Sequence, residues 1–298
     1  MGIPKDLIRD NPELSEWCIL SCYRGSIAHG MYIPSKDPNS IDDKDALAIC
    51  VPPLDYYFGL RTYGSRGTRE IKRDEWDIVV YEARKMMSLL LQGNPNVLNI
   101  LWLNENYYIT ITDAGRLLID GRGLFVGKHV YKSFTGYAYS QLHRMTHHAF
   151  EGYMGKKRKQ LVEKYGYDTK NAAHLIRLLR MGIEFLTDGI LYVERQDASQ
   201  LLEIKRGEWS LERVKEEADR LFARAEEAYI ASRLPSAPDR AGVNRLCIEM
   251  VRMTHDARNE SSTAIYSSGY AQAAARVAQI VAEATGAETV TPEDDGSR

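Results

Sequence analysis

The chain has 298 residues, of which 44% are hydrophobic, and its formal net charge is −2. This length and apolar content are sufficient for two domains with buried cores. The small negative charge excludes a nucleic-acid binder that is basic over its whole surface, although it permits a local basic patch.

The cysteine pattern argues against disulfides and against a zinc site. Cys18, Cys22, Cys50 and Cys247 lie in apolar segments, without Cys-x-x-Cys or Cys-His spacing. We therefore expect reduced thiols and a cytoplasmic protein. Neither a signal peptide nor a run of about eighteen apolar residues is recognisable, so secretion and membrane spanning are not expected.

The first predicted strand covers residues 17–23, which are apolar and β-prone, and it ends at Gly25-Ser26. A Gly-Ser turn after a strand exposes backbone N–H groups and a hydroxyl, and both kinds of group bind phosphate oxygens. Gly25 and Ser26 are therefore candidate phosphate-binding residues.

The second predicted strand covers residues 46–51, follows Asp43 and Asp45, and is stopped by two prolines. On a strand, residues i and i+2 project from the same face about 6 to 7 Å apart. We predict that Asp43 and Asp45 flank one metal site and that Lys44 points the other way. The alternative is that both are ordinary acids at a turn or strand end.

Helical patterns begin at about residue 82 and dominate after about residue 125. Residues 82–91 form the first predicted long helix, closed by Gly93, and Asn94-Pro95 caps the next element. Apolar residues three and four apart predict further helices over residues 131–150, 169–186, 211–231, 239–254 and 266–284. The predicted class is α+β. A small mixed β-sheet domain occupies residues 1–125, a helical domain occupies 126–285, and 286–298 form a disordered tail.

Positive charge is concentrated between residues 116 and 180, where thirteen Lys or Arg face four Asp or Glu. Such a surplus attracts polyphosphate or nucleic acid. A solvated loop or helix end explains the same composition equally well.

An ordered set of residues near the N-terminus resembles the signature of the polymerase-β-type nucleotidyltransferase superfamily. The set is Gly25-Ser26-x-Ala28-x-Gly30, then Asp43-x-Asp45, then a strand ending at Val51-Pro52-Pro53. Within it, the chain is most similar to the predicted nucleotidyltransferase family associated with RNA repair and RNA ligases. Residues 93–98, 166–179 and 206–209 extend the similarity, which covers about residues 19 to 250.

Two parts of the chain, covering three positions, depart from the pattern of these relatives. Leu47-Ala48 stands where Arg-Gly is usual, and Asp42 stands where Ser is common. The first departure removes an arginine that would orient substrate or carboxylates, but it leaves the aspartates in place.

The resemblance implies transfer of a nucleoside monophosphate from an NTP to a hydroxyl, with two Mg²⁺ ions about 3.5 to 4 Å apart. Mn²⁺ is an acceptable substitute. The resemblance also asks for a third acid on a neighbouring strand. We predict Asp77, because it opens the β-prone segment 76–81, while Asp74, Glu75 and Glu82 remain alternatives. Asp77 is also the predicted acceptor of the hydroxyl proton.

A cationic stripe is predicted on the helix that begins near residue 169. Lys170, His174 and Arg177 recur at intervals of four and three residues, which places them along one side. Burying such groups without anionic partners is costly. We expect them to line the cleft and to hold the triphosphate, because Arg grips phosphate bidentately. The alternative is that they pair with acids of a neighbouring helix.

Tyr137 is the candidate for stacking on the nucleotide base, since family analogy places the helix over 131–150 in the nucleotide cleft. Core packing is the alternative for this side chain. His143 and His147 lie one helical turn apart, but no third ligand is evident and no metal is assigned to them.

The predicted acceptor is the 3′ end of an RNA such as tRNA, and a protein side chain or a small molecule remains chemically open. Two other functions stay open as well. One is a non-catalytic module that senses NTP or RNA, which the Leu47-Ala48 departure favours. The other is a toxin that adds nucleotides to tRNA or protein.

Overall fold

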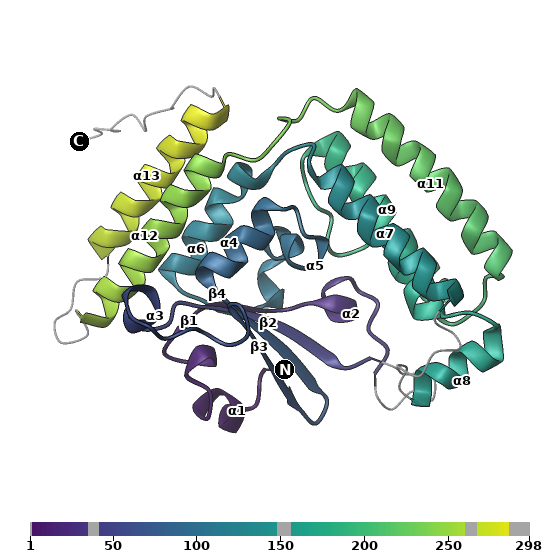
Figure 1. The fold of residues 1–298 in the computed structure, drawn as a ribbon, viewed down its shortest axis with the longest axis horizontal. Coiled ribbons are helices and arrows are strands. Elements are labelled where there is room, and N and C mark those ends of the chain that lie inside the picture. The colour runs from purple at the N-terminus through teal and green to yellow at the C-terminus, as the bar shows by residue number, and fades with distance from the viewer. Residues whose placement is uncertain (1, 35–41, 148–155, 260–266, 286–298) are drawn as a thin grey trace, which may run out of the picture.

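A five-stranded mixed sheet and a set of surrounding helices make up the computed structural model, which describes residues 2–34, 42–147, 156–259 and 267–285 (Figure 1). The strand order is β3-β4-β2-β1-β5. Strands β2 and β4 are parallel, and the other neighbours are antiparallel. The strands are β1 (Cys18–Tyr23), β2 (Lys44–Cys50), β3 (Thr68–Arg73), β4 (Trp76–Glu82) and β5 (Tyr108–Ile111).

The longer helices lie on one side of the sheet and beyond its edge (Figure 1). They are α4 (Ala83–Leu91), α6 (Asp113–Asp120), α7 (Val130–His147), α8 (Lys156–Tyr165), α9 (Thr169–Asp188), α10 (Ala198–Lys205), α11 (Leu211–Ala231), α12 (Arg240–Asn259) and α13 (Ser267–Thr285). The short helices are α1 (Lys5–Arg9), η1 (Pro12–Leu14), α2 (Gly25–Ala28), α3 (Asp55–Phe58), α5 (Pro95–Leu98), η2 (Asn99–Trp102), η3 (Glu105–Tyr107) and η4 (Gly121–Phe125).

The two faces of β2 enter different cores, because side chains alternate along a strand. Leu47 and Ile49 join the large core, which also holds residues of α4, α6 and α9. Ala46 and Ala48 join a smaller core with residues of α1 and η1. Asp45 therefore shares the face of Leu47, which is the face that the helices cover.

The large core extends from sheet residues such as Leu20 to helical residues such as Leu175 and Leu246. It therefore crosses the predicted boundary at 125/126, and the sheet and helical regions share buried surface. The division into two domains remains a prediction. No disulfide joins the four cysteines, all of which lie in the described residues. No helix in the described residues combines the length and apolarity that a membrane span needs.

The predicted α+β class is confirmed, and most elements lie where the patterns place them. Glu82 caps α4 by accepting a hydrogen bond from the Arg84 N–H at 3.0 Å, and Asn94 caps α5 by accepting one from Asn96 at 2.9 Å. Strand β2 begins at Lys44, so it includes Asp45, while Asp43 precedes it. Residues 148–150 of one predicted helix and the predicted tail 286–298 lie outside the described residues.

Candidate active site

Asp45 and Asp77 lie next to each other on parallel strands, since they are direct partners in the β2–β4 register. Neighbouring strands are about 4.8 Å apart, so the two side chains project side by side from one face. Lys44 points to the opposite face, as predicted, with its ammonium 5.6 Å from the centroid of the Trp76 ring. Asp43 lies just before the strand and is exposed.

The two carboxylates differ in their surroundings. Burial raises the pKa of Asp45, the positive charges of Arg24 and Lys170 oppose this, and the negative charges of Asp77 and Asp43 add to it. Asp77 Oδ2 lies 3.7 Å from Lys72 Nζ. Its Oδ1 is buried and has no hydrogen-bond partner within the described chain. A buried carboxylate oxygen without a donor is available to a cation.

The Gly25-Ser26 turn packs directly against Asp45. The Arg24 N–H donates to the Asp45 carbonyl oxygen at 3.0 Å, and Gly25 then adopts φ +61°. Ser26 follows in the first turn of α2, and its buried hydroxyl has no partner among the residues described. The turn therefore places an unused hydroxyl beside the acids.

A cavity of about 250 Å³ opens between this turn and α9. Asp45, Gly25 and Ser26 line it from the sheet side, and Lys170, His174 and Arg177 line it from α9, so six of the predicted site residues meet there. The other lining residues are Arg24, His29, Met31, Pro95, Asn96, Asn99, Ala173 and Lys205. Asp43 and Asp77 stand outside this lining.

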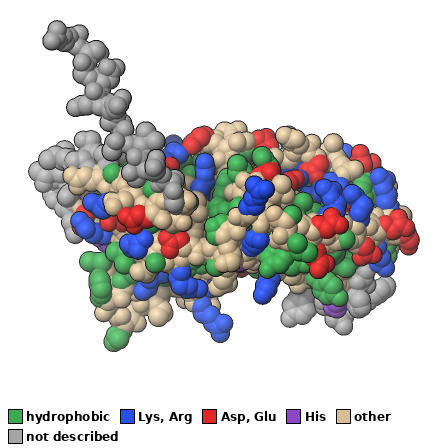
Figure 2. Space-filling model, turned by 90° about the horizontal axis from the view of Figure 1, so that it is seen from above, with side chains coloured by type: hydrophobic (Ala, Val, Ile, Leu, Met, Phe, Trp, Pro, Cys, Tyr) green, Lys and Arg blue, Asp and Glu red, His purple; other side chains and the backbone are tan. Residues whose placement is uncertain are grey.

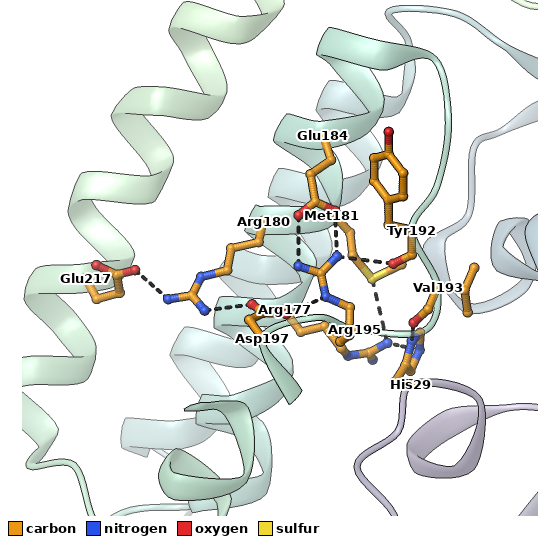
Figure 3. Close-up of polar contacts among 10 residues, drawn as sticks. All are labelled: His29, Arg177, Arg180, Met181, Glu184, Tyr192, Val193, Arg195, Asp197 and Glu217. Carbon is orange, nitrogen blue, oxygen red and sulfur yellow. Dashed lines mark hydrogen bonds and ion pairs between the residues drawn. The ribbon is translucent and has the colours of Figure 1, made fainter. Parts of the chain in front are cut away.

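Arg177 is held by a histidine instead of a carboxylate (Figure 3). Its guanidinium donates to His29 Nε2 and reaches Met181 Sδ at 3.9 Å. His29 Nδ1 lies 2.8 Å from the Val193 carbonyl oxygen, which assigns the ring proton to Nδ1 and leaves Nε2 as the acceptor. Burial lowers the pKa of His29 well below its ordinary value, and Arg177 lowers it further, so the ring is neutral at pH 7.

Arg177 differs from the nearby arginines Arg180 and Arg195 in its hydrogen-bond and ion-pair partners. Arg180 pairs with Asp197 at 2.7 Å and Glu217 at 2.9 Å, and Arg195 pairs with Glu184 and Asp197 (Figure 3). No carboxylate in the described residues lies within 4.0 Å of Arg177. Burial lowers its pKa to about 9, the charge of Arg195 adds to this, and Asp197 opposes it. Arg177 is thus a half-buried cation on the cavity wall with room for an anion.

A family model described as "RNA repair pathway DNA polymerase beta family" matches residues 14–249. The chain belongs to this RNA repair polymerase-β family. The match confirms the resemblance drawn from the Gly25-Ser26 and Asp43-x-Asp45 motifs, and it indicates a polymerase-β-like nucleotidyltransferase of RNA repair. A search of curated proteins gives no match.

Polymerase-β-like enzymes generally use divalent metal ions, and the acids of this family member fit that requirement in part. In the described residues, no group of three or more His, Cys, Asp or Glu side chains is close enough to hold an ion. Asp45 and Asp77 nevertheless present adjacent carboxylates with a free buried oxygen. Mg²⁺ typically takes one or two protein carboxylates, several waters and substrate phosphates. The metal ligands therefore remain a prediction.

Tyr137 is not among the cavity-lining residues of this RNA repair polymerase-β protein. Its hydroxyl accepts a hydrogen bond from Asn94 Nδ2 at 2.9 Å, and its ring packs against the large core. The structure therefore favours the core-packing alternative, because α7 turns this side chain toward the start of α5.

Four titratable residues at or beside the cavity of this RNA repair polymerase-β protein were not predicted as site residues from the sequence. They are Arg24, His29, Asp42 and Lys205. Arg24 directly precedes the Gly25–Gly30 motif and His29 lies within it, so a cation and an imidazole beside a phosphate-binding turn were a usable signal. Asp42 and Lys205 meet through a contact between distant segments, and no local pattern announces it.

Proposed function

We propose that the protein transfers a nucleoside monophosphate from an NTP to a hydroxyl group, with the 3′ end of an RNA as acceptor and Mg²⁺ as cofactor. One observation carries the proposal. A single cavity is lined by Asp45 and the Gly25-Ser26 turn on one side and by Lys170 and Arg177 on the other. An acid that attracts metal ions, Asp45, thus faces cations that attract phosphates.

Asp43, Asp45 and Asp77 are the residues that would hold two Mg²⁺ ions. Bound there, the ions would supply charge neutralisation and an activated acceptor hydroxyl. The carboxylate of Asp77 is the proposed acceptor of the hydroxyl proton. Asp45 is the second candidate, because burial raises its pKa.

The cationic wall would bind the phosphates. Arg177 offers a half-buried guanidinium that lacks a carboxylate partner within the described residues, and Lys170 extends from the same helix. A guanidinium contacts two phosphate oxygens at once. The Ser26 hydroxyl would donate a hydrogen bond to a phosphate oxygen. Positioning and charge neutralisation would account for most of the rate, as in other phosphoryl transfers.

The distribution of charge favours local contact with an RNA end over binding along a broad basic surface. Figure 2 shows Lys and Arg side chains in separate groups, interspersed with Asp and Glu, over the face in view. The surplus of positive charge lies in residues 116–180, which include the cavity-lining part of α9. A short RNA end that contacts this segment would reach the cavity. Its affinity would fall as the salt concentration rises.

The test combines the purified protein with Mg²⁺, each labelled NTP in turn, and RNA that ends in a free 3′ hydroxyl. We expect labelled RNA from the wild type and a loss of at least about 100-fold in Asp45→Asn and Asp77→Asn. Asp74→Asn is the matched control, because Asp74 is exposed in the β3–β4 turn at φ 52°, a conformation that Asn tolerates. RNA with a blocked 3′ end should stay unlabelled. Equal labelling by wild type and Asp45→Asn would overturn the proposal.

A non-catalytic NTP sensor is the second candidate. It is favoured by the absence of a preassembled three-acid group in the described residues. This alternative predicts NTP binding with no labelled product from any acceptor, and binding that survives Asp45→Asn in the presence of Mg²⁺.

A further inference from the structure

Lys205 is a buried lysine on the wall of the candidate active site. It is the last residue of α10, its side chain is 3% exposed, and it lines the cavity with Arg177 and Lys170. Its ammonium donates to the Met31 carbonyl oxygen at 3.0 Å and to Asp42 Oδ2. Lysine is almost never fully buried unless its charge is paired.

Asp42 joins this lysine to a second one. Its carboxylate is fully buried, Oδ2 also accepts a hydrogen bond from the Ile33 N–H at 3.0 Å, and Oδ1 lies 3.4 Å from Lys170 Nζ. One carboxylate thus contacts lysines from α9 and α10. Asp42 is also three residues before Asp45 on the same chain segment.

This three-residue group brings two lysines and one aspartate together beside the cavity. Two ammonium groups share one carboxylate, and Arg177 adds a third cation nearby, since its charge also acts on Lys205. A purely structural pair would be replaceable by apolar residues at little cost. Here three cationic side chains, Lys205, Lys170 and Arg177, border the cavity, where they can contact an anion.

We propose that Lys205 binds a phosphate of the substrate triphosphate, and that Asp42 is a positioning residue that orients Lys205 and Lys170 toward it. This inference rests on the proposed function and adds a phosphate ligand from outside the α9 stripe. It also gives the α10 helix a direct part in the site, since Lys205 connects α10 to Met31 and to the segment that carries Asp45.

Asp42 would also keep Lys205 charged. Burial lowers the pKa of Lys205, and the charges of Lys170 and Arg177 lower it further, while Asp42 opposes all three. Without Asp42, Lys205 would lose its proton at a lower pH than in the wild type. A neutral amine would bind phosphate weakly.

The first experiment measures binding of inorganic triphosphate to the full chain by calorimetry, without RNA. Lys205→Met is expected to weaken binding at least about tenfold, and Lys205→Arg to restore part of it, because a charged hydrogen-bond donor is kept. Lys215→Met is the matched control, since Lys215 is exposed on α11. Equal affinity in Lys205→Met and Lys215→Met would overturn the inference.

The second experiment tests Asp42 by the pH dependence of the same binding. Asp42→Asn should lose more affinity at pH 8 than at pH 6, because the pKa of Lys205 is lowered further when Asp42 no longer opposes its burial. Each affinity is divided by that of Asp219→Asn at the same pH, which cancels the titration of triphosphate itself; Asp219 is exposed on α11. A pH-independent ratio would refute the positioning role.

A folding control keeps both tests interpretable. If Asp42→Asn unfolds, Asp42→Asn/Lys205→Met removes both buried charges, and its affinity should fall to that of Lys205→Met or below. Wild-type affinity in this double variant would contradict the inference. Nucleotide transfer that needs Asp45 but ignores Lys205→Met would overturn the inference alone. Triphosphate binding that needs Lys205, in a protein that transfers no nucleotide, would overturn the proposed function alone.

Discussion

Gly25 and Asp45 are in such close contact that a β-carbon at position 25 would overlap Asp45 Oδ2 and lie 3.2 Å from its Cγ. Gly25 also has a φ of +61°, which other residues rarely adopt. The turn that carries Ser26 and the strand that carries Asp45 can therefore pack this closely only because residue 25 has no side chain. This contact explains in physical terms why a glycine opens the Gly25-Ser26 motif.

We expect Gly25→Ala to reduce nucleotidyl transfer by about 100-fold, because a displacement of about 1 Å at reacting groups has that effect. The free energy of unfolding should fall by only about 1 to 2 kcal/mol, which is the cost of the left-handed conformation for a residue other than glycine. Transfer rates and urea unfolding measure the two effects. Gly136→Ala is the control, since a β-carbon there meets nothing within 4 Å in α7. Gly136→Ala should raise the free energy of unfolding by about 0.5 to 1 kcal/mol and leave activity unchanged. Equal activity of the two variants would contradict this account.

Asp45→Asn should make the metal-free protein more stable at pH 7 while it abolishes transfer. The pKa of Asp45 is raised in the fold, so the folded state binds more protons than the unfolded state between the ordinary and the raised value. Its ionised form therefore destabilises the fold, and wild-type stability rises as pH falls through that window. The advantage of Asp45→Asn in thermal unfolding should shrink on acidification. A variant less stable than the wild type at pH 7 would show that Asp45 is stabilising.

Lys72→Gln should strengthen Mn²⁺ binding by about two- to fivefold, because the ammonium competes with the ion for Asp77. The effect is small since the Lys72 side chain is 65% exposed, and exposed ion pairs are worth about 0.2 to 1 kcal/mol. Asp77 raises the pKa of Lys72, so the lysine remains charged over the usable pH range. Electron paramagnetic resonance of free Mn²⁺ measures the affinity. Unchanged binding would mean that no ion contacts Asp77.

Much of the fold could be predicted because it depends on local periodicity. The residues of α11 repeat at helical spacing, and the predicted range 211–231 is the observed helix. Lys44 and Asp45 point to opposite faces because alternation is a property of any strand. The contact between Lys205 and Asp42 spans 163 positions, and that between Arg177 and His29 spans 148. Such contacts arise from how α9 and α10 pack on the sheet, which no local pattern encodes.

Arg177→Met should stabilise the ligand-free protein, since it removes a half-buried, partly desolvated charge that has no carboxylate partner in the described residues. The same change should remove most of the stabilisation that triphosphate gives the wild type, because a ligand stabilises only in proportion to its binding. Thermal unfolding with and without inorganic triphosphate measures both effects. Arg180→Met serves as the contrast. It should destabilise the protein by about 1 to 3 kcal/mol, because Asp197 and Glu217 lose their shared partner while Arg195 and Arg220 still pair with them. A destabilised Arg177→Met protein would contradict the account.

The central claim is that acids of β2 and β4 gather divalent ions beside a triphosphate held by the α9 wall. Crystals soaked with Mn²⁺ and a non-hydrolysable NTP test it most directly, through the anomalous signal of the metal. We predict Mn²⁺ on the carboxylates of Asp45 and Asp77, with the triphosphate against Ser26, Lys170 and Arg177. Mn²⁺ bound elsewhere, or a nucleotide outside this cavity, would contradict the account.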